Sequence, residues 1–186
     1  MLMRAPIVAA NWKMHGSAVL ASELFATLRP ELERTSCEIA LCPPFPLIPV
    51  IRETVQGSRI LVGAQNVHAQ TSGAFTGEVS PLMLKGLCKY VILGHSERRH
   101  IFGESSELVG KKVQAAINYG LLPILCVGEQ LVDRQEGRAV EVVEGQLNAG
   151  LEGVTTPSGL VIAYEPVGAI GTGKAATTLD AQDMSA

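Results

Sequence analysis

The stretch Leu160–Lys174, Leu-Val-Ile-Ala-Tyr-Glu-Pro-Val-Gly-Ala-Ile-Gly-Thr-Gly-Lys, shows the pattern on which the whole chain is built. The apolar run Leu160–Tyr164 predicts a buried strand, and Glu165 places a carboxylate at its C-terminal end. The stiff Pro166 and a glycine-rich loop follow, and we expect a helix to begin near Thr178. A strand, an acid, a flexible loop and a helix N-terminus in this order are typical of a site that holds an anionic substrate under a lid.

The same alternation of short apolar runs and helical segments extends along the 186 residues. The predicted strands are Ile7–Asn11, Glu38–Cys42, Ile60–Ala64, Tyr90–Leu93, Leu122–Val127 and Leu160–Tyr164. The other predicted helices are Ala18–Leu28, Leu47–Val55, Pro81–Leu87, Leu108–Tyr119 and Ala139–Asn148. Near-continuous apolar strands favour a parallel sheet covered on both faces, so the sequence predicts an α/β fold of about six β/α units. Periodicity alone leaves open whether this sheet is open or closed.

The composition indicates one globular domain, residues 1–186, with 47% hydrophobic residues and a net charge of −3. The densest basic cluster, Arg98-Arg99-His100, has no interleaved aromatic residues for base stacking, so we expect no nucleic-acid partner. No apolar run reaches the ~18–20 residues of a membrane span. The N-terminus has no signal-peptide pattern, and we therefore expect a cytoplasmic protein with no membrane partner.

The cysteines match no zinc-binding spacing, and we expect no metal site. There are four of them, Cys37, Cys42, Cys88 and Cys126. Cys42 and Cys126 fall in or beside apolar strands, where a thiol behaves as a small buried hydrophobic group. Free thiols in a reducing cytoplasm are the simplest interpretation.

Polar residues gather where the predicted strands end. Asn11 and Lys13 leave the first strand two residues apart, so their side chains point the same way in extended chain. His95 and Glu97 leave the fourth strand with the same spacing, and Glu165 leaves the sixth. Both barrels and open α/β sheets place their chemistry at the C-terminal ends of parallel strands. The sequence therefore predicts a site at this end of the sheet.

Each of these residues also has a plainer interpretation. Lys13 supplies a fixed cation for a phosphate or an enolate oxygen, or it is a surface lysine. A neutral His95 at a helix N-terminus polarises a carbonyl, or it is an ordinary loop histidine. Partial burial of Glu165 is expected to raise its pKa toward the range of a general base, although an exposed loop acid fits the same position. For Cys126 we favour a structural role.

A series of short motifs strengthens the functional interpretation. They are Asn11–Met14 (NWKM), Cys42–Phe45 (CPPF), Gly63–Asn66 (GAQN), Gly73–Glu78 (GAFTGE), Gly94–Arg99 (GHSERR), Cys126–Glu129 (CVGE), and Ala163–Val167 (AYEPV) with Ala169–Lys174 (AIGTGK). With these motifs in this order, the chain resembles the triosephosphate isomerase family over essentially its full length. Several independent motifs at compatible spacing are far more specific than any single one. The resemblance implies part of a (β/α)₈ barrel.

The resemblance also implies a mechanism. Glu165 would remove a proton from the carbon beside the carbonyl of dihydroxyacetone phosphate or glyceraldehyde 3-phosphate. His95 and Lys13 would stabilise the enediolate oxygens, and Asn11 would help to hold the substrate. Gly171, in a loop that closes over the substrate, would donate its backbone N–H to the phosphate. No cofactor is implied, because the carbonyl itself accepts the electron pair.

Further residues are implied to support the site from outside. Glu97 would hold Lys13, with Ser96 and Cys126 beside the reacting groups. The family forms homodimers, in which the loop Val67–Val79, with Thr76 near its tip, docks into the partner beside Asn11 and Lys13. Gln65 belongs to the same interface.

A nucleotide-binding P-loop is a competing interpretation of the glycine-rich segment. Gly168–Lys174 matches the spacing G-x-x-x-x-G-K. Ala175 stands where a P-loop needs Ser or Thr to hold magnesium, and Pro166 stands where its strand meets the turn. The resemblance explains the match, because Gly168 occupies a position where the family usually has Trp.

The chain is short for the family. A complete (β/α)₈ barrel takes ~250 residues, and the sequence predicts six strands in 186. The loops after strands seven and eight of such barrels supply much of the phosphate site. The resemblance therefore predicts a chain that lacks the last two β/α units. A non-catalytic relative that keeps the catalytic residues is the alternative to an active isomerase.

Overall fold

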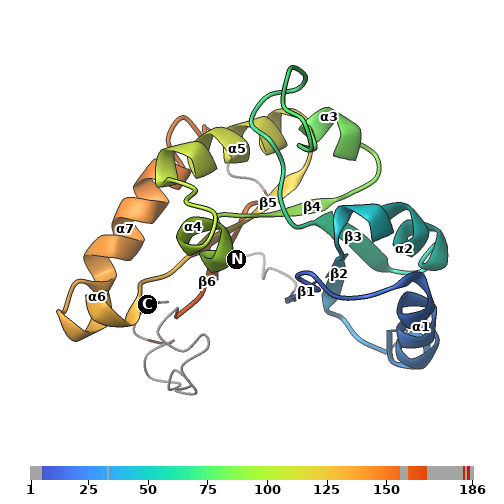
Figure 1. Cartoon of the computed structure of the whole chain (residues 1–186). Coiled ribbons are helices and arrows are strands. Elements are labelled where there is room, and N and C mark those ends of the chain that lie inside the picture. Colours follow the sequence, from blue (N-terminus) through green and yellow to red (C-terminus); the bar gives the residue numbers. More distant parts are fainter. Residues whose placement is uncertain (1–5, 33, 156–158, 167–181, 183, 185–186) are drawn as a thin grey trace.

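Six parallel strands form one sheet in sequence order, from β1 to β6. The computed structural model describes residues 6–32, 34–155, 159–166, 182 and 184. The strands are β1 Ile7–Asn11, β2 Glu38–Cys42, β3 Ile60–Ala64, β4 Tyr90–Leu93, β5 Leu122–Val127 and β6 Val161–Tyr164. The predicted strands are confirmed, and only the sixth begins one residue later than predicted. The sheet curves into an incomplete barrel (Figure 1).

Most helices lie along the outer side of the curved sheet: Figure 1 shows α1–α3 over the first half and α5–α7 over the second, whereas α4 lies within the curve. They are α1 Ala18–Leu32, α2 Ile48–Thr54, α3 Pro81–Leu84, α4 Ser96–His100, α5 Ser106–Asn118, α6 Leu131–Gln135 and α7 Ala139–Gly150, with a 3₁₀ turn at Phe45–Leu47. The helix expected near Thr178 lies outside the described residues. None of the helices in the described ranges is long and apolar enough to cross a membrane.

The helix predictions are correct in place and differ in extent. The third helix was predicted to reach Leu87 but ends at Leu84, because Lys85 leaves helical backbone at ψ 124° and Gly86 has a positive φ of 78°. Ser80 caps its N-terminus by accepting the Met83 N–H, and Pro81 occupies the first helical position. The short helices α4 and α6 were not among the predicted helices, since their polar sequences carry no apolar repeat.

The two faces of the sheet bury two separate layers of side chains. Along β4, Tyr90 and Ile92 face the inside of the curve, whereas Val91 and Leu93 face the helices. This alternation follows from the two-residue period of a strand. The middle strands are therefore buried on both faces, as the apolar runs predict. β1 and β6 are less covered, and Val8 and Ile162 are 54% and 42% exposed.

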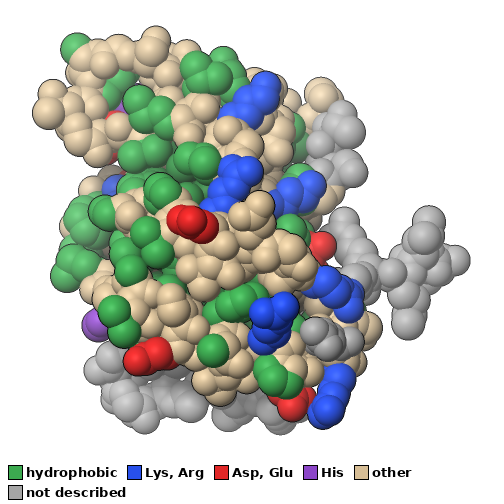
Figure 2. All heavy atoms as spheres, turned by 90° about the vertical axis from the view of Figure 1, so that its right-hand side faces the viewer, with side chains coloured by type: hydrophobic (Ala, Val, Ile, Leu, Met, Phe, Trp, Pro, Cys, Tyr) green, Lys and Arg blue, Asp and Glu red, His purple; other side chains and the backbone are tan. Residues whose placement is uncertain are grey.

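The outer surface over α1 and α2 contains no single dense patch of one charge. Figure 2 shows this face, on which Lys and Arg side chains are spread and separated by hydrophobic and neutral surface. The functional residues predicted from the sequence lie elsewhere, at the C-terminal ends of the strands.

Candidate active site

Three strands deliver the predicted site residues to one edge of the sheet. Asn11 ends β1 and Lys13 follows it, His95 and Glu97 follow β4, and Glu165 follows β6. Because all six strands run parallel, their C-terminal ends meet at the same edge. The side chains converge there, although β1 and β6 are the first and last strands of the sheet.

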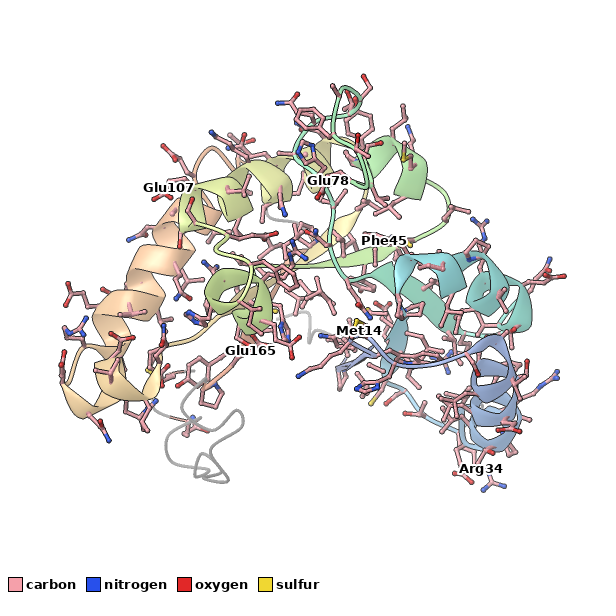
Figure 3. The ribbon with its side chains drawn as sticks, viewed as in Figure 1. Met14, Arg34, Phe45, Glu78, Glu107 and Glu165 are labelled. Atoms are coloured by element: carbon pink, nitrogen blue, oxygen red, sulfur yellow. The ribbon has the colours of Figure 1, made fainter. Side chains whose placement is uncertain are left out.

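Glu165 is held by two hydrogen bonds from the segment after β4. Its backbone N–H donates to the Val127 carbonyl at 2.8 Å, which extends the pairing of β6 with β5 by one residue. Its Oε1 lies 3.0 Å from His95 Nε2, and its Oε2 accepts the Ser96 N–H at 2.9 Å. Figure 3 shows Glu165 next to α4, with Met14 and Phe45 across from it. Both carboxylate oxygens are therefore engaged.

His95 caps helix α4 and is oriented by that cap. Its Nδ1 accepts the Glu97 N–H at 3.2 Å. A neutral imidazole that accepts at Nδ1 carries its hydrogen on Nε2, the nitrogen that faces Glu165. The side chain is only 10% exposed. The helix cap thus presents an N–H donor toward the middle of the site.

The pKa of Glu165 differs from the sequence-based expectation. Burial raises it, but the hydrogen bonds from His95 and from the Ser96 backbone N–H outweigh burial, and the net pKa lies below the ordinary value. The expectation that partial burial would bring this pKa toward the general-base range is therefore wrong for this arrangement. The reason is that sequence patterns predict burial but not the donors that a distant segment supplies.

Lys13 is positioned by its two polar neighbours. Its backbone has a positive φ of 51°, a conformation that a residue other than glycine adopts rarely. The Asn11 Oδ1 accepts the Lys13 N–H at 3.0 Å and supports this turn. The Lys13 Nζ lies 2.9 Å from Glu97 Oε1. The ammonium group is thus held at the rim of the site, 42% exposed.

Cys126 and Ser96 pack beneath these groups. Cys126 is 3% exposed in the inner layer of the sheet, and burial raises the pKa of its thiol far above the usual range. A neutral thiol in this position fits a packing role. Ser96 is 4% exposed, and its Oγ has no hydrogen-bond partner among the described residues.

A cleft of about 300 Å³ opens beside Lys13, Asn11 and His95. Phe45, Met14 and Phe102 supply apolar walls. Gln65 also lines this cleft, and its side-chain amide donates to the Cys42 carbonyl at 2.8 Å. Thr76 is exposed in the loop between β3 and α3 and is not part of the lining. The structure therefore brings Gln65 to the site residues and leaves Thr76 outside.

Sequence patterns missed a buried polar network behind the cleft. Lys112 of α5 is 3% exposed, and its Nζ donates to Asn66 Oδ1 at 2.9 Å and to Glu104 Oε1 at 2.6 Å. Glu104 also accepts from Arg98 Nε at 2.5 Å. Asn66 and Arg98 line the cleft. A lysine in an amphipathic helix is normally predicted to lie at the surface, so the local sequence gives no indication of this buried network.

Several predictions fall on residues without a structural description. Gly171, Gly168 and the rest of the glycine-rich segment up to Lys174 lie outside the described residues, so neither the loop nor the P-loop match is placed. Within the described part of the chain, no group of three or more His, Cys, Asp or Glu side chains is arranged to hold a metal ion.

Comparisons with known proteins match nearly the whole chain. A sequence model of the family described as "Triosephosphate isomerase" matches residues 6–186. The triosephosphate isomerase of Carboxydothermus hydrogenoformans is 52% identical over 98% of this chain and 74% of its own length. That of Symbiobacterium thermophilum is 53% identical over 97% and 72%, and that of Moorella thermoacetica is 50% identical over 99% and 75%. The chain thus spans about three quarters of the length of these relatives. On these matches, the chain belongs to the triosephosphate isomerase family.

Proposed function

We propose that this protein interconverts dihydroxyacetone phosphate and glyceraldehyde 3-phosphate, a step of glycolysis and gluconeogenesis. The observation that carries the proposal is the contact between Glu165 and His95, 3.0 Å apart at the strand ends, with Lys13 at the rim of the same site. A base, an N–H donor and a cation are the groups that proton transfer beside a carbonyl requires. Relatives about 50% identical to this chain are named triosephosphate isomerase, the enzyme of this reaction.

Glu165 is the proposed base. It takes a proton from the carbon next to the carbonyl, and the electron pair moves onto the carbonyl oxygen to form an enediolate. The same proton then returns to the neighbouring carbon, while a second proton passes between the two oxygens. Because both oxygens of Glu165 are hydrogen-bonded in this structure, the carboxylate must leave His95 and Ser96 to reach the substrate.

His95 and Lys13 are the proposed stabilisers of the enediolate. The Nε2–H of His95 is directed into the site by the helix cap, and it becomes free to donate to a substrate oxygen when Glu165 moves. Lys13 supplies a positive charge near the same oxygens, and Glu97 holds it in place. Asn11 completes the substrate contacts, and Gly171 is proposed as a phosphate donor. The reaction needs no cofactor, since the substrate carbonyl accepts the electrons.

The alternatives receive less support. A P-loop nucleotide binder requires a magnesium-holding hydroxyl, and Ala175 occupies that position. A non-catalytic relative is consistent with the residues of the site, but relatives named as the isomerase match along nearly all of this chain. Proton transfer by Glu165 and His95 therefore remains the function that the site supports best.

We also propose that the protein is a cytoplasmic homodimer. Phe75, in the loop between β3 and α3, is 44% exposed, and Met14 at the cleft is 92% exposed. Docking the loop tip with Thr76 into the cleft of a second copy would cover both side chains. Four free cysteines fit a reducing compartment, and the net charge of −3 gives no attraction to nucleic acid. A Thr76→Arg substitution should lower the molar mass seen by light scattering.

The catalytic proposal is tested by coupled assay of glyceraldehyde 3-phosphate conversion. Glu165→Gln keeps the shape of the side chain and removes the base, so kcat should fall by about 10²–10⁴-fold. Exposed Glu144, on helix α7, is the matched control as Glu144→Gln and should leave kcat unchanged. Activity that survives Glu165→Gln would refute Glu165 as the base. Inactivity of the unsubstituted protein would favour the non-catalytic relative.

A further inference from the structure

The guanidinium of Arg99 joins three elements beneath the active site. Its Nε donates to the Gly94 carbonyl at 2.7 Å, at the end of β4. One terminal nitrogen donates to the Cys126 carbonyl in β5 at 3.1 Å, and the other donates to Ser106 Oγ at the start of α5, at 2.9 Å. All three nitrogens are engaged, each with a different segment. A planar fork of donors is the geometry that only arginine provides.

Both bonded carbonyls belong to residues next to those that hold His95 and Glu165. Gly94 precedes His95 in the chain. Cys126 precedes Val127, whose carbonyl accepts the Glu165 N–H at 2.8 Å. Arg99 therefore connects the backbone that carries His95 to the backbone that holds Glu165. No hydrogen bond of the sheet reaches from Gly94 to Cys126, because the β4–β5 register among the described residues ends at Leu93 and Leu125.

The fit around this guanidinium is tight. Gly94 has a positive φ of 70°, and a Cβ there would lie 2.6 Å from the Arg99 terminal nitrogen and 3.1 Å from the Cys126 carbonyl oxygen. The absent side chain at Gly94 thus makes room for the guanidinium. A glycine and an arginine five residues apart in the motif GHSERR act together at this point.

The charge of Arg99 is not neutralised by these contacts, since the bonded groups are two carbonyls and a hydroxyl. Burial lowers the pKa of Arg99, and Cys126, Glu104 and Glu165 oppose that effect. A guanidinium nevertheless remains protonated at all ordinary pH values. The interaction with Glu165 raises the pKa of Arg99, and the same attraction between opposite charges favours the ionised form of Glu165.

The other titratable groups around Glu165 do not replace this charge. His95 is the direct hydrogen-bond partner of Glu165. Burial and the nearby Arg99 lower the pKa of His100, and burial raises that of Cys126, so both are neutral near pH 7. On the far side of the site, Lys13 is paired with Glu97. Lys13 is thus paired with a carboxylate, whereas the contacts of Arg99 given above are with two carbonyls and a hydroxyl.

We propose that Arg99 is a positioning residue for the isomerisation. Its hydrogen bonds to the Gly94 and Cys126 carbonyls fix His95 relative to Glu165, and its positive charge favours the ionised form of Glu165. This inference rests on the function proposed above. It assigns two separable roles to one side chain, one geometric and one electrostatic. A residue that only stabilised the fold would change neither the rate per folded molecule nor the titration of Glu165.

Two substitutions separate the roles. Arg99→Lys keeps the charge but has one nitrogen, which cannot hold Gly94, Cys126 and Ser106 together. Arg99→Met removes both the positive charge and the three hydrogen bonds. The matched control is Arg59→Met, which removes a guanidinium that donates to the Thr35 carbonyl at 2.9 Å, at the opposite end of the sheet. For each protein, kcat, KM and the thermal midpoint are measured across the pH range.

We expect kcat to fall by about 10–10²-fold in both Arg99 variants, because small displacements of reacting groups are costly, with KM little changed. In Arg99→Met the acidic limb of the kcat/KM profile should move to higher pH, since the carboxylate loses a cation that favours it. In Arg99→Lys this limb should stay in place. Arg59→Met should match the unsubstituted protein in kcat and in pH profile.

A measurement without turnover keeps the inference independent of activity. The Glu165 carboxyl carbon is titrated by ¹³C NMR, with Glu165→Gln to assign the signal. Its titration should move to higher pH in Arg99→Met and not in Arg99→Lys. The His95 Nε2–H resonance should weaken in both variants as the contact loosens. If Arg99→Met does not fold, Arg99→Lys still decides the geometric role through kcat and this resonance.

The inference is overturned if folded Arg99 variants keep the kcat, the Glu165 titration and the His95 resonance of the unsubstituted protein and lose only thermal stability. Failure of the isomerase proposal looks different. In that case the unsubstituted protein has no activity, while the two NMR signals still report whether Arg99 orders the pair.

Discussion

Among the single residues of the site, Glu165 has both carboxylate oxygens hydrogen-bonded, so neither oxygen is free to accept a proton from a substrate. His95 and the Ser96 N–H hold both of its oxygens and lower its pKa despite burial. A carboxylate in this position remains ionised to lower pH than usual. Loss of these two donors would raise its pKa, because burial alone raises it.

The lowered pKa of Glu165 predicts a contribution to acid stability. A carboxyl group whose pKa is lower in the folded state stabilises the fold above its unfolded pKa of ~4.3, and this contribution is lost as pH falls through the folded pKa. Glu165→Gln should therefore lower the free energy of unfolding near pH 7 and have a smaller effect at the acid end. Urea denaturation between pH 3 and pH 7 measures this difference. A Glu165→Gln effect that is the same at every pH would contradict it.

The cysteines predict a selective thiol reaction. Burial raises the pKa of Cys42 and of Cys88 to about 12, and raises that of Cys126 further, so these thiols are protonated and covered. Cys37 is half-buried. At pH 8 a disulfide reagent should therefore modify Cys37 in the native protein and all four thiols after unfolding. Cys37→Ser is the control, and rapid native reaction in that variant would show the prediction to be wrong.

At the scale of elements, α5 and α7 approach each other at a glycine. A Cβ on Gly110 would lie 2.3 Å from the backbone oxygen of Ala149. Gly110→Ala should force the helices apart and lower the free energy of unfolding by about 1–3 kcal/mol. Gly145→Ala in the same α7 helix is the control, because its Cβ meets open space, and it should stabilise by about 0.5–1 kcal/mol. If the denaturant midpoints move in the same direction in both variants, the prediction that this close helix contact makes Gly110→Ala destabilising is wrong.

Sequence patterns predicted the strands of this protein well and its short helices poorly. Strand ranges were predicted closely, because a buried parallel strand is a short apolar run with turn residues on either side. Helix α4 contains Ser96, Glu97 and Arg98 and has no apolar repeat, and its cap by His95 depends on where β4 ends. Short helices of this kind are specified by their surroundings rather than by their own periodicity.

At the scale of the whole molecule, the two outermost strands differ from the rest. Among the described residues, β1 pairs only with β2 and β6 only with β5. Val8 and Ile162 on these strands are 54% and 42% exposed. Partly covered apolar strands with one paired edge are templates for association with other chains. From the described residues we therefore predict two surfaces for association, the edges of β1 and β6 and the proposed dimer loop.

We expect the 186-residue protein to associate beyond a dimer at high concentration. Light scattering should show a molar mass that rises with concentration above twice the 19.7 kDa of the chain. A charge at either exposed edge, Val8→Lys or Ile162→Lys, should lower this mass, whereas Thr76→Arg should affect only the dimer. A monomer of constant mass with one cooperative thermal transition would contradict the prediction.

Apolar runs and the polar residues that follow them were enough to predict six strands in chain order and to place Glu165, His95 and Lys13 at the C-terminal edge of the sheet as the candidate site. These depend on neighbours in the chain, on apolar runs and on polar residues at their ends. How those residues are held depends on contacts between segments that are far apart in the chain. Ser96 and Glu165 are 69 residues apart, as Asn66 and Lys112 are 46 apart and Arg99 and Cys126 are 27 apart. These hydrogen bonds form only when the fold brings distant segments together at the C-terminal ends of the strands. The bond from the Ser96 N–H helps to lower the pKa of Glu165, and no local pattern predicts it.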